Sequence, residues 1–364
     1  MLVVVAPDKF AGTLTAEQAA EAIAAGWRQA RPDDEIRTVP MADGGPGTAT
    51  LVAQSVAGAR FHQAEVADPL GHAVTARWLS LPDGRALIES AEACGLHLVD
   101  PDRRSPLRST TYGVGQLLRA AVDTGATEII VGLGGSATVD GGAGMAGAWG
   151  HRLLRSDGNG LKVGAEYLAG LDRIVAAAPP SVPVIAAVDV DAPLLGPDGA
   201  VAGFAAQKGA TPQDVPALEA GLRHLADIAE RDLTGGPWRD LPGAGAAGGL
   251  GFGLAAFAGA RLEPGAAIVA EMVELAHDIT GAGAVVTGEG RLDRWSLRGK
   301  LPGAVADLAR RHGVGLYAVV GQAVDGAGDA FDRIEVLGED GLRDPVRLVI
   351  ERAAALAAAI DRDD

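Results

Sequence analysis

Short apolar runs alternate with helical segments at both ends of the chain, and this order constrains the fold more than any other sequence feature. Residues 2–6 are an apolar run that ends at Pro7, and residues 15–31 are predicted as a helix that opens with the capping box Thr15-Ala-Glu-Gln18. Residues 36–39 and 47–57 repeat the strand–helix order, and the C-terminal third returns to it. Such alternation predicts a parallel sheet with helices on its faces.

The middle of the chain has a different pattern. Residues 61–67, 74–81 and 85–89 are predicted as consecutive strands without helices between them, which indicates an antiparallel element. A length of 364 residues also suggests two domains, at about 150 residues each. We therefore predict an α/β protein with two α/β domains. One is a doubly wound, flavodoxin- or Rossmann-like parallel-sheet domain from residues 1–60, 107–150 and 280–364, and the other is an inserted mixed α/β domain from residues 61–106 and 151–279.

Composition excludes several classes of function. The chain has 31 basic and 47 acidic side chains, and the formal charge of −16 argues against nucleic acid or an anionic membrane as the main partner. One cysteine, Cys94, excludes an internal disulfide and a multi-cysteine metal site. The opening residues MLVVVAPDKF lack a signal-peptide pattern, and no apolar run reaches the roughly 18 residues that a membrane span needs. We expect a cytoplasmic protein that acts on small molecules, with a homodimer left open.

The strongest functional signal is the segment GLGGSATVDGGAG at residues 132–144, which follows a predicted strand and precedes a predicted helix. Small residues between a strand and a helix aim backbone N–H groups at a phosphate. The candidate phosphate ligands are Gly134, Gly135, Ser136 and Thr138, and Asp140 could hold a metal. The alternative is a tight turn that needs several glycines for its backbone alone.

This loop has two further interpretations. Gly132, Gly134 and Ala137 satisfy a loose dinucleotide fingerprint, so an NAD-type oxidoreductase is an alternative. The acid that this fingerprint requires would be Asp157, which lies in a Ser-Asp-Gly turn rather than at a strand end, so we favour this alternative less. The loop is also similar to the phosphate loop of the small-molecule kinases that include galactokinase and homoserine kinase, but the order of elements does not suit that fold.

Lysines are rare enough for their positions to be informative. Only four of the 31 basic residues are lysines, and three of these, Lys9, Lys208 and Lys300, stand among glycines and polar residues. Lysine is a compact charge that suits phosphate. We predict that Lys300 or Lys208 neutralises the charge that develops during phosphoryl transfer, and that Lys9 and its neighbour Asp8 contact the substrate.

Acids and arginines are concentrated in residues 288–300, GEGRLDRWSLRGK, after another predicted strand. Such a segment suits phosphate and Mg²⁺. Arg291 and Arg298 are candidates for binding a substrate carboxylate, since arginine pairs with carboxylates in a bidentate way. Elsewhere, Asp43 belongs to the glycine-rich segment MADGGPGT at residues 41–48, and Asp189 directly follows a predicted strand.

Several of these segments, in this order and spacing, resemble motifs of the glycerate kinase family of the type that forms 2-phosphoglycerate, and the resemblance covers nearly the whole chain. They are APDKF from residue 6, PMADGG from 40, SPLRSTTYG from 105, residues 132–144, DAPLLGP from 191, QKGA from 207 and residues 287–300. The resemblance implies two α/β domains and an ATP-dependent glycerate 2-kinase, which transfers the γ-phosphoryl group of ATP to a hydroxyl of D-glycerate.

That reaction assigns roles to the acids. A hydroxyl needs a base or a metal to become a good nucleophile, and Asp189 or Asp293 is the expected base because each follows a strand within a matching motif. Asp43 and Glu289 are the expected Mg²⁺ ligands, since Mg²⁺ usually takes one or two carboxylates.

The chain departs from the family pattern at three positions. Ala11 stands where a lysine is usual, Pro46 where an acid is usual, and Ala192 where an asparagine is usual. The alternative to a glycerate 2-kinase is therefore a related kinase that acts on another small hydroxy acid, or a family member with impaired activity.

Overall fold

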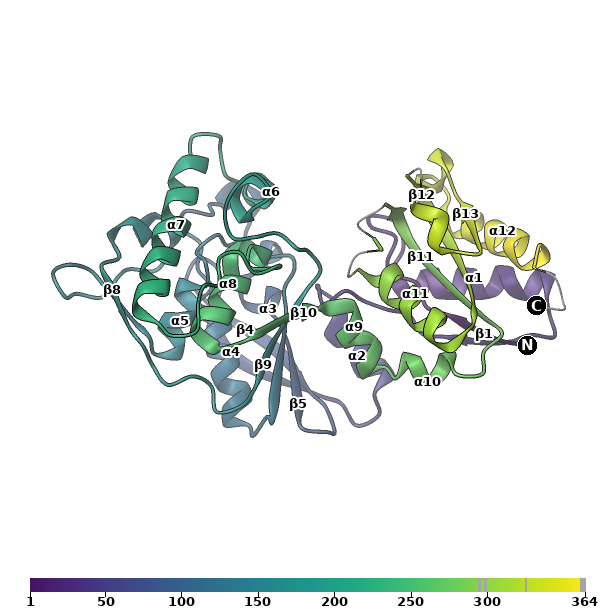
Figure 1. Cartoon of the computed structure of the whole chain (residues 1–364), viewed down its shortest axis with the longest axis horizontal. Helices are drawn as coiled ribbons and strands as arrows, with labels where there is room; N and C mark the ends of the chain where they lie inside the picture. Colours follow the sequence, from purple (N-terminus) through teal and green to yellow (C-terminus); the bar gives the residue numbers. More distant parts are fainter. Residues whose placement is uncertain (294–295, 298–299, 325, 361–364) are drawn as a thin grey trace. The chain divides into compact units, whose positions relative to one another are not determined.

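The computed structural model of the protein describes residues 1–293, 296–297, 300–324 and 326–360 (Figure 1). The chain forms two compact units. We call residues 1–43 and 264–364 the terminal unit and residues 44–263 the central unit. Arg298, a predicted substrate ligand, lies outside the described residues. Among the helices of the described residues, none has the length and apolar character that crossing a membrane requires.

The terminal unit is built on a parallel sheet of five strands in the order β13-β12-β11-β1-β2. Counted along the chain and read from β2, this is the order 2-1-3-4-5 that flavodoxin-like sheets have. The predicted parallel sheet from discontinuous segments is thus confirmed. Its strands are β1 (Leu2–Val5), β2 (Glu35–Thr38), β11 (Ala284–Leu292), β12 (Gly315–Ala323) and β13 (Arg333–Val336).

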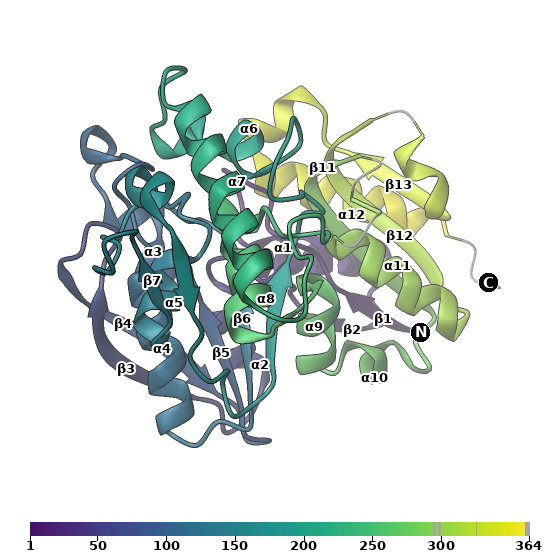
Figure 2. The ribbon, with the colours of Figure 1, turned by 60° about the vertical axis from the view of Figure 1, so that its left-hand side comes forward.

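Helices pack on both faces of this sheet. Val3 and Val5 of β1 belong to one apolar cluster with α1 (Ala16–Ala30) and α12 (Pro345–Ala358). Figures 1 and 2 show α11 (Leu301–His312) on the opposite face, with α9 (Gly265–Met272) and α10 (Leu275–Ile279) beside it. The predicted capping box starts α1, because Thr15 Oγ1 accepts a bond of 3.2 Å from the Gln18 N–H and Gln18 Oε1 accepts one of 3.0 Å from the Thr15 N–H.

Strand β11 is longer than predicted. The sequence indicates a strand at residues 284–286 and a loop from residue 287, but β11 continues to Leu292 because β12 pairs with it as far as Ala323. Of the residues of β11, strand β1 pairs only with 284–286. The loop after β1 therefore lies against the second half of β11, where the Asp8 N–H donates to the Gly288 carbonyl at 2.8 Å.

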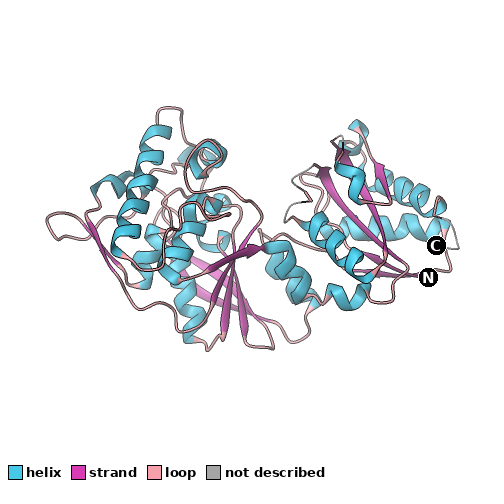
Figure 3. Ribbon diagram, viewed as in Figure 1, coloured by secondary structure: helices cyan, strands magenta, loops and turns pink. Residues whose placement is uncertain are grey.

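The central unit contains a mixed sheet of six strands in the order β10-β9-β6-β5-β4-β3 (Figure 3). The pairs β3–β4 and β4–β5 are antiparallel, as predicted for the middle of the chain, whereas β5–β6 and β6–β9 are parallel. The strands are β3 (Arg60–Ala67), β4 (Ala73–Ser80), β5 (Arg85–Glu89), β6 (Glu128–Gly132), β9 (Val184–Val188) and β10 (Arg261–Pro264). A separate antiparallel pair is formed by β7 (Arg152–Leu154) and β8 (Arg173–Val175).

This division of the chain differs from the predicted one. The prediction groups residues 44–60 and 107–150 with the doubly wound domain, but they lie in the central unit. The physical reason is local pairing: β5, α4 (Tyr112–Asp123) and β6 form a β–α–β crossover, so β6 pairs with the strand that precedes it in the chain. The sequence also predicts two helices between residue 253 and about residue 277, and a strand at residues 261–264 lies within that range.

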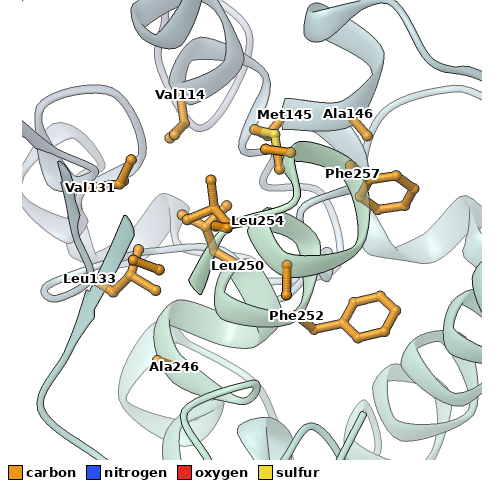
Figure 4. Packing of buried hydrophobic residues seen from close by; sticks show 14 of the residues in the cluster. Val114, Val131, Leu133, Met145, Ala146, Ala246, Leu250, Phe252, Leu254 and Phe257 are labelled. Atoms are coloured by element: carbon orange, nitrogen blue, oxygen red, sulfur yellow. The ribbon is translucent and has the colours of Figure 1, made fainter. Parts of the chain in front are cut away.

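Helix α8 (Ala246–Ala258) packs its apolar side chains into the core of the central unit. Figure 4 shows Leu250 and Leu254 of α8 facing Leu133, just after β6, and Met145 of α5 (Ala143–Trp149). The remaining helices are α2 (Thr48–Ser55), α3 (Ala91–Cys94), α4 (Tyr112–Asp123), α5 (Ala143–Trp149), α6 (Ala200–Phe204) and α7 (Val215–Asp232).

Replacing Gly26 by Ala is expected to destabilise the terminal unit. Gly26 lies where α1 crosses α12, and an added Cβ would meet the Ile350 carbonyl oxygen at 2.2 Å. Such overpacking costs about 1–3 kcal/mol, against the gain in helix propensity of about 1 kcal/mol. The control is Gly147→Ala in α5, where an added Cβ meets nothing within 4 Å. Thermal unfolding should show a lower midpoint for Gly26→Ala only, and equal midpoints for the two variants would contradict the close helix crossing.

Candidate active site

A cavity of about 430 Å³ lies in the terminal unit at the carboxyl ends of β1 and β11. The strand order of the sheet reverses between these two strands, and ligands of open α/β sheets bind at such a point. The predicted site residues Asp8, Lys9, Glu289 and Arg291 all line this cavity. The structure therefore brings together residues that are far apart in the sequence.

Glu289 is a half-buried acid of this cavity with a raised pKa. It lies on the extended part of β11, and its buried Oε1 has no hydrogen-bond partner among the described residues. Burial raises the pKa of Glu289 to about 7, and the negative charges of Asp8 and Asp293 act in the same direction, against a hydrogen bond from Ser296 and the positive charge of Lys300. A cation bound at this carboxylate would favour its ionised form.

The other predicted residues of the terminal unit surround this acid. Lys9 Nζ forms an ion pair of 3.5 Å with Asp43 Oδ2, and Asp8 Oδ1 accepts a bond of 2.7 Å from the Lys9 N–H. Asp293 Oδ1 accepts a bond of 3.0 Å from the Ser296 N–H. The predicted metal ligand Asp43 is thus paired with a lysine, whereas Glu289 lies among acids.

These acids fit Mg²⁺ only with help from a ligand. Within the residues that the structure describes, no group of three or more His, Cys, Asp or Glu side chains is placed to hold a metal ion. Mg²⁺ usually takes one or two carboxylates and completes its octahedral shell with phosphate oxygens and water. The orphaned oxygen of Glu289, near Asp8 and Asp293, meets that smaller requirement.

A second, smaller cavity of about 170 Å³ lies in the central unit. Its walls include Gly134, Gly135, Ser136, Asp189 and Lys208, all predicted from the sequence. It therefore combines a cation, a carboxylate, a hydroxyl and glycine backbone. Asp189 and Asp293, the two candidate bases, belong to different units.

Lys208 is the buried cation of this pocket. It lies at the end of the short 3-10 helix Ala206–Lys208, and only 3% of its surface is exposed. Its Nζ donates to Ser136 Oγ and to the Thr138 carbonyl, both at 2.8 Å. Burial lowers the pKa of Lys208 to about 8, and the negative charge of Asp140 opposes that decrease.

Asp140 fixes the second half of the loop from within. It is fully buried, and its carboxylate accepts bonds from the Thr111 N–H at 2.9 Å and from the Gly142 and Gly144 N–H groups at 3.2 Å. Asp140 therefore occupies the N-terminus of α5, which the sequence analysis assigned to a phosphate. Its hydrogen bonds to the protein also account for it without the metal role that we considered.

The first half of the loop is the part that can meet a ligand. Among the described residues, no acceptor is found for the backbone N–H groups of Gly134 and Gly135, which line the pocket. Thr138 is fully buried behind the pocket, and its Oγ1 has no partner in the described part of the chain. Of the predicted phosphate ligands, Thr138 thus supports Lys208 through its carbonyl instead of facing the cavity.

The sequence of the chain matches known proteins over most of its length. Residues 3–339 match the sequence model of the glycerate kinase family. The chain belongs to the glycerate kinase family. It is therefore a phosphotransferase, as the resemblance of its motifs implied, and the predicted kinase class is confirmed.

The similarity to individual proteins extends over most of the chain. The chain is 44% identical over 326 residues to a glycerate kinase of Bacillus subtilis (strain 168), covering 88% of this chain and 85% of the relative. It is 40% identical over 333 residues to a glycerate 2-kinase of Escherichia coli (strain K12), covering 90% and 87%. A crystal structure from Salmonella typhimurium LT2, described as a glycerate kinase 2, matches with a TM-score of 0.83 and 38% identity over 98% of this chain and 97% of that one.

Membership in the glycerate kinase family leaves the dinucleotide interpretation without support. Strand β6 ends at Gly132, and residues 133–142 separate it from α5, so the loop is not the tight strand-to-helix turn of a dinucleotide fold. Asp157 accepts a bond of 3.0 Å from the Asn159 N–H and closes an exposed turn.

Glu89 is a residue of the site region that sequence reasoning missed. It is the last residue of β5, it is 6% exposed, and its carboxylate accepts bonds from the backbone N–H groups of Gly47 and Ala49 at 3.1 and 2.6 Å. Glu89 thereby holds the segment around Pro46 in place. Gly134 and Gly135 lie against this segment, since a Cβ added to either glycine would contact the Pro46 ring. The position of Glu89 at the carboxyl end of a predicted strand could have identified it, because the same kind of position indicated Asp189.

Replacing Glu289 by Gln is expected to stabilise this glycerate kinase family member at high pH. Because the folded-state pKa of Glu289 is about 7 and its ordinary value is 4.5, the stability that its protonated form contributes is present at low pH and is lost as the pH rises through about 7. The variant removes that loss, a gain on the order of 2 kcal/mol at pH 8 that shrinks toward pH 5. Urea unfolding at both pH values measures it.

The control for this prediction is Glu21→Gln, which changes an exposed acid of α1 in the same unit. It should leave the pH dependence of the free energy of unfolding as in the wild type. A Glu289→Gln variant whose stability follows the wild type at both pH values would show that the carboxyl is an ordinary solvated acid.

Proposed function

We propose that this chain is an ATP-dependent glycerate 2-kinase, which transfers the γ-phosphoryl group of ATP to a hydroxyl of D-glycerate. The observation that carries the proposal is the central-unit pocket, where the carboxylate Asp189 and the buried cation Lys208 line the same small cavity. A hydroxy acid needs both: a positive group for its carboxylate and a base for its hydroxyl. Membership in the glycerate kinase family supports the same reaction.

The proposed chemistry divides between the two cavities. Asp189 accepts the proton of the attacking hydroxyl, or Asp293 does so in the terminal unit, and Lys208 and Lys300 offset negative charge that develops during transfer. Glu289 and Asp8, with Asp43 near Lys9, are the proposed residues for Mg²⁺. When bound, Mg²⁺ neutralises phosphate charge and orients the phosphoryl oxygens.

One departure from the family pattern lines the terminal-unit cavity, and the other two lie next to the central-unit pocket. Ala11 lines the terminal-unit cavity, and Pro46 lies against Gly134 and Gly135 of the other. The carbonyl of Ala192 accepts from the Gly245 N–H at 2.8 Å, next to Ala246 of the pocket wall. These positions make a related hydroxy acid the second candidate substrate.

An acceptor panel tests the proposed function. Pure protein with ATP and Mg²⁺ is given D-glycerate, L-glycerate, lactate or tartronate, and ADP release is followed. The proposal expects the highest kcat/KM with D-glycerate. A higher value with another acid would establish the related-kinase alternative, and no acceptor-dependent ADP release with any of the acids would mark an impaired family member.

We further propose a cytoplasmic location, in keeping with a soluble substrate pair and a net charge of −16.

The variant Asp189→Asn is expected to lower kcat by about 10²–10⁴, because the amide keeps the size of the side chain but cannot accept the proton. The matched control is Asp191→Asn, two residues on, which is exposed and does not line the pocket. Steady-state kinetics with D-glycerate measure both. Wild-type turnover by Asp189→Asn together with a loss in Asp293→Asn would assign the base to Asp293.

Restoring the usual family residues at Ala11 and Pro46 is expected to raise glycerate phosphorylation if the natural substrate has drifted. Ala11→Lys adds a cation to a cavity that already holds the acids Asp8 and Glu289, and Pro46→Glu returns a carboxylate to the segment beside Gly134. The double variant should gain kcat/KM for D-glycerate over the wild type. Gln29→Lys is the control, because it adds the same charge to an exposed position of α1. An equal gain with the control would show a nonspecific charge effect.

A further inference from the structure

The two cavities differ in size and chemistry in a way that assigns the two substrates. This inference rests on the proposed kinase function. The central-unit pocket has about 170 Å³ and the terminal-unit cavity about 430 Å³. Sites for ligands of the size of a nucleotide are usually about 300–1,000 Å³. Of these two cavities, the terminal-unit cavity is the one that reaches that range.

The central-unit pocket is kept small by a strained turn. Ala246 and Ala247 form one wall, and Ala247 has a left-handed backbone with φ of 52°, which is costly for a residue with a Cβ. The next residue, Gly248, lies so close to the loop that an added Cβ would be 1.9 Å from the Thr138 carbonyl oxygen. Its own carbonyl accepts from the Gly141 N–H at 3.2 Å, which ties the turn to the loop.

The groups at this small pocket suit a carboxylate and a hydroxyl. The Gly134 and Gly135 N–H groups and the Lys208 ammonium are donors for an anion, and Asp189 is an acceptor for a hydroxyl. A short hydroxy acid offers that combination within a few ångströms. The triphosphate of a nucleotide offers no hydroxyl to Asp189, and its several negative charges would lie beside that carboxylate with only the single charge of Lys208 to offset them.

The terminal-unit cavity combines a charged part with an apolar part. Lys9, Arg291, Asp8 and Glu289 are the charged part. Leu342 also lines the cavity and is 73% exposed, more than any other large apolar side chain of the described residues. An exposed leucine beside a charged cavity leaves apolar surface that a flat ring would cover.

We propose that the terminal-unit cavity binds the nucleotide, with its base against Leu337 and Leu342 and its phosphates toward Lys9 and Arg291, and that the central-unit pocket binds the carboxylate of the hydroxy acid through Lys208 and the backbone at Gly134 and Gly135. This assignment reverses the expectation that residues 132–144 bind the phosphates of ATP. It also reverses the expectation that Arg291 and Lys9 contact the hydroxy acid.

Photoaffinity labelling of the wild-type protein tests the assignment without any change of sequence. The probe is 8-azido-ATP with Mg²⁺, whose reactive group sits on the base, and unmodified ATP is the competitor. After irradiation, mass spectrometry locates the labelled peptide. Labels that ATP suppresses should fall in residues 10–13 or 321–342. Labels in residues 94–98, 133–136, 204–208 or 246–247, or no label that ATP suppresses, would overturn the nucleotide assignment.

Binding measurements on variants test both halves together. Leu342→Asp is expected to weaken the nucleotide Kd at least about tenfold and to leave the D-glycerate Kd within about twofold. Lys208→Met is expected to do the opposite. The control is Val346→Asp, an apolar position of α12 that is 46% exposed and does not line the cavity, and it should change neither Kd. Thermal unfolding of each variant confirms that it is folded.

The outcomes separate this inference from the proposed function. Loss of nucleotide binding in Lys208→Met with unchanged D-glycerate binding would overturn the assignment while leaving the kinase function intact. Failure of the function appears independently, as no D-glycerate-dependent ADP release in the wild type. In that case labelling at residues 321–342 would still place the nucleotide, and a wild type that binds no D-glycerate would overturn the acid half.

Discussion

The burial of one ammonium group constrains the central unit more than any other interaction. Lys208 is 3% exposed, and a charge removed from water costs several kcal/mol unless hydrogen bonds replace its hydration. Both of its acceptors, Ser136 Oγ and the Thr138 carbonyl, belong to one loop, so the segment that carries Lys208 must stay against that loop. Asp140 immobilises the rest of the loop through backbone N–H groups. The glycine N–H groups that remain are therefore held rigidly, which is what recognition of an anion requires.

The terminal unit reaches a functional cavity by a different route. Strand β1 ends early while β11 and β12 continue as a pair, so the loop after β1 is held against the second half of β11. This brings Asp8 to Glu289 and leaves a buried carboxylate oxygen of Glu289 without a hydrogen-bond partner in the described part of the chain. Such a group is destabilising in the ligand-free protein, and its persistence is typical of a site where ligand binding repays the cost. In each unit, a buried charge marks the cavity.

Much of the site could be predicted from the sequence because its residues follow strands. Asp8, Glu289 and Asp189 were indicated by their position after apolar runs, and the structure places them at the two cavities. The roles of Asp140 and Thr138 could not be predicted, since a glycine-rich loop does not show which of its polar side chains turn inward. The division of the chain into two units could not be predicted from the sequence pattern either. Residues 128–132 are equally apolar whichever sheet they join, and the pairing of β5 with β6 places them in the central unit. Glu89 is also an acid at the end of a strand, but the sequence analysis treats residues 85–89 only as a strand and gives Glu89 no role in a site.

Transfer to the hydroxyl on the carbon next to the carboxylate is tested most directly by the position of the phosphate in the product. Phosphorus NMR of a mixture of the protein, ATP, Mg²⁺ and D-glycerate distinguishes the two esters, because phosphorus couples to a single proton in 2-phosphoglycerate and to a methylene pair in 3-phosphoglycerate. With Asp189 and Lys208 in one small pocket, we predict a doublet that grows as ADP appears. A triplet would place the reaction on the other hydroxyl, and ADP without any new ester signal would contradict the assignment of a glycerate kinase reaction to this chain.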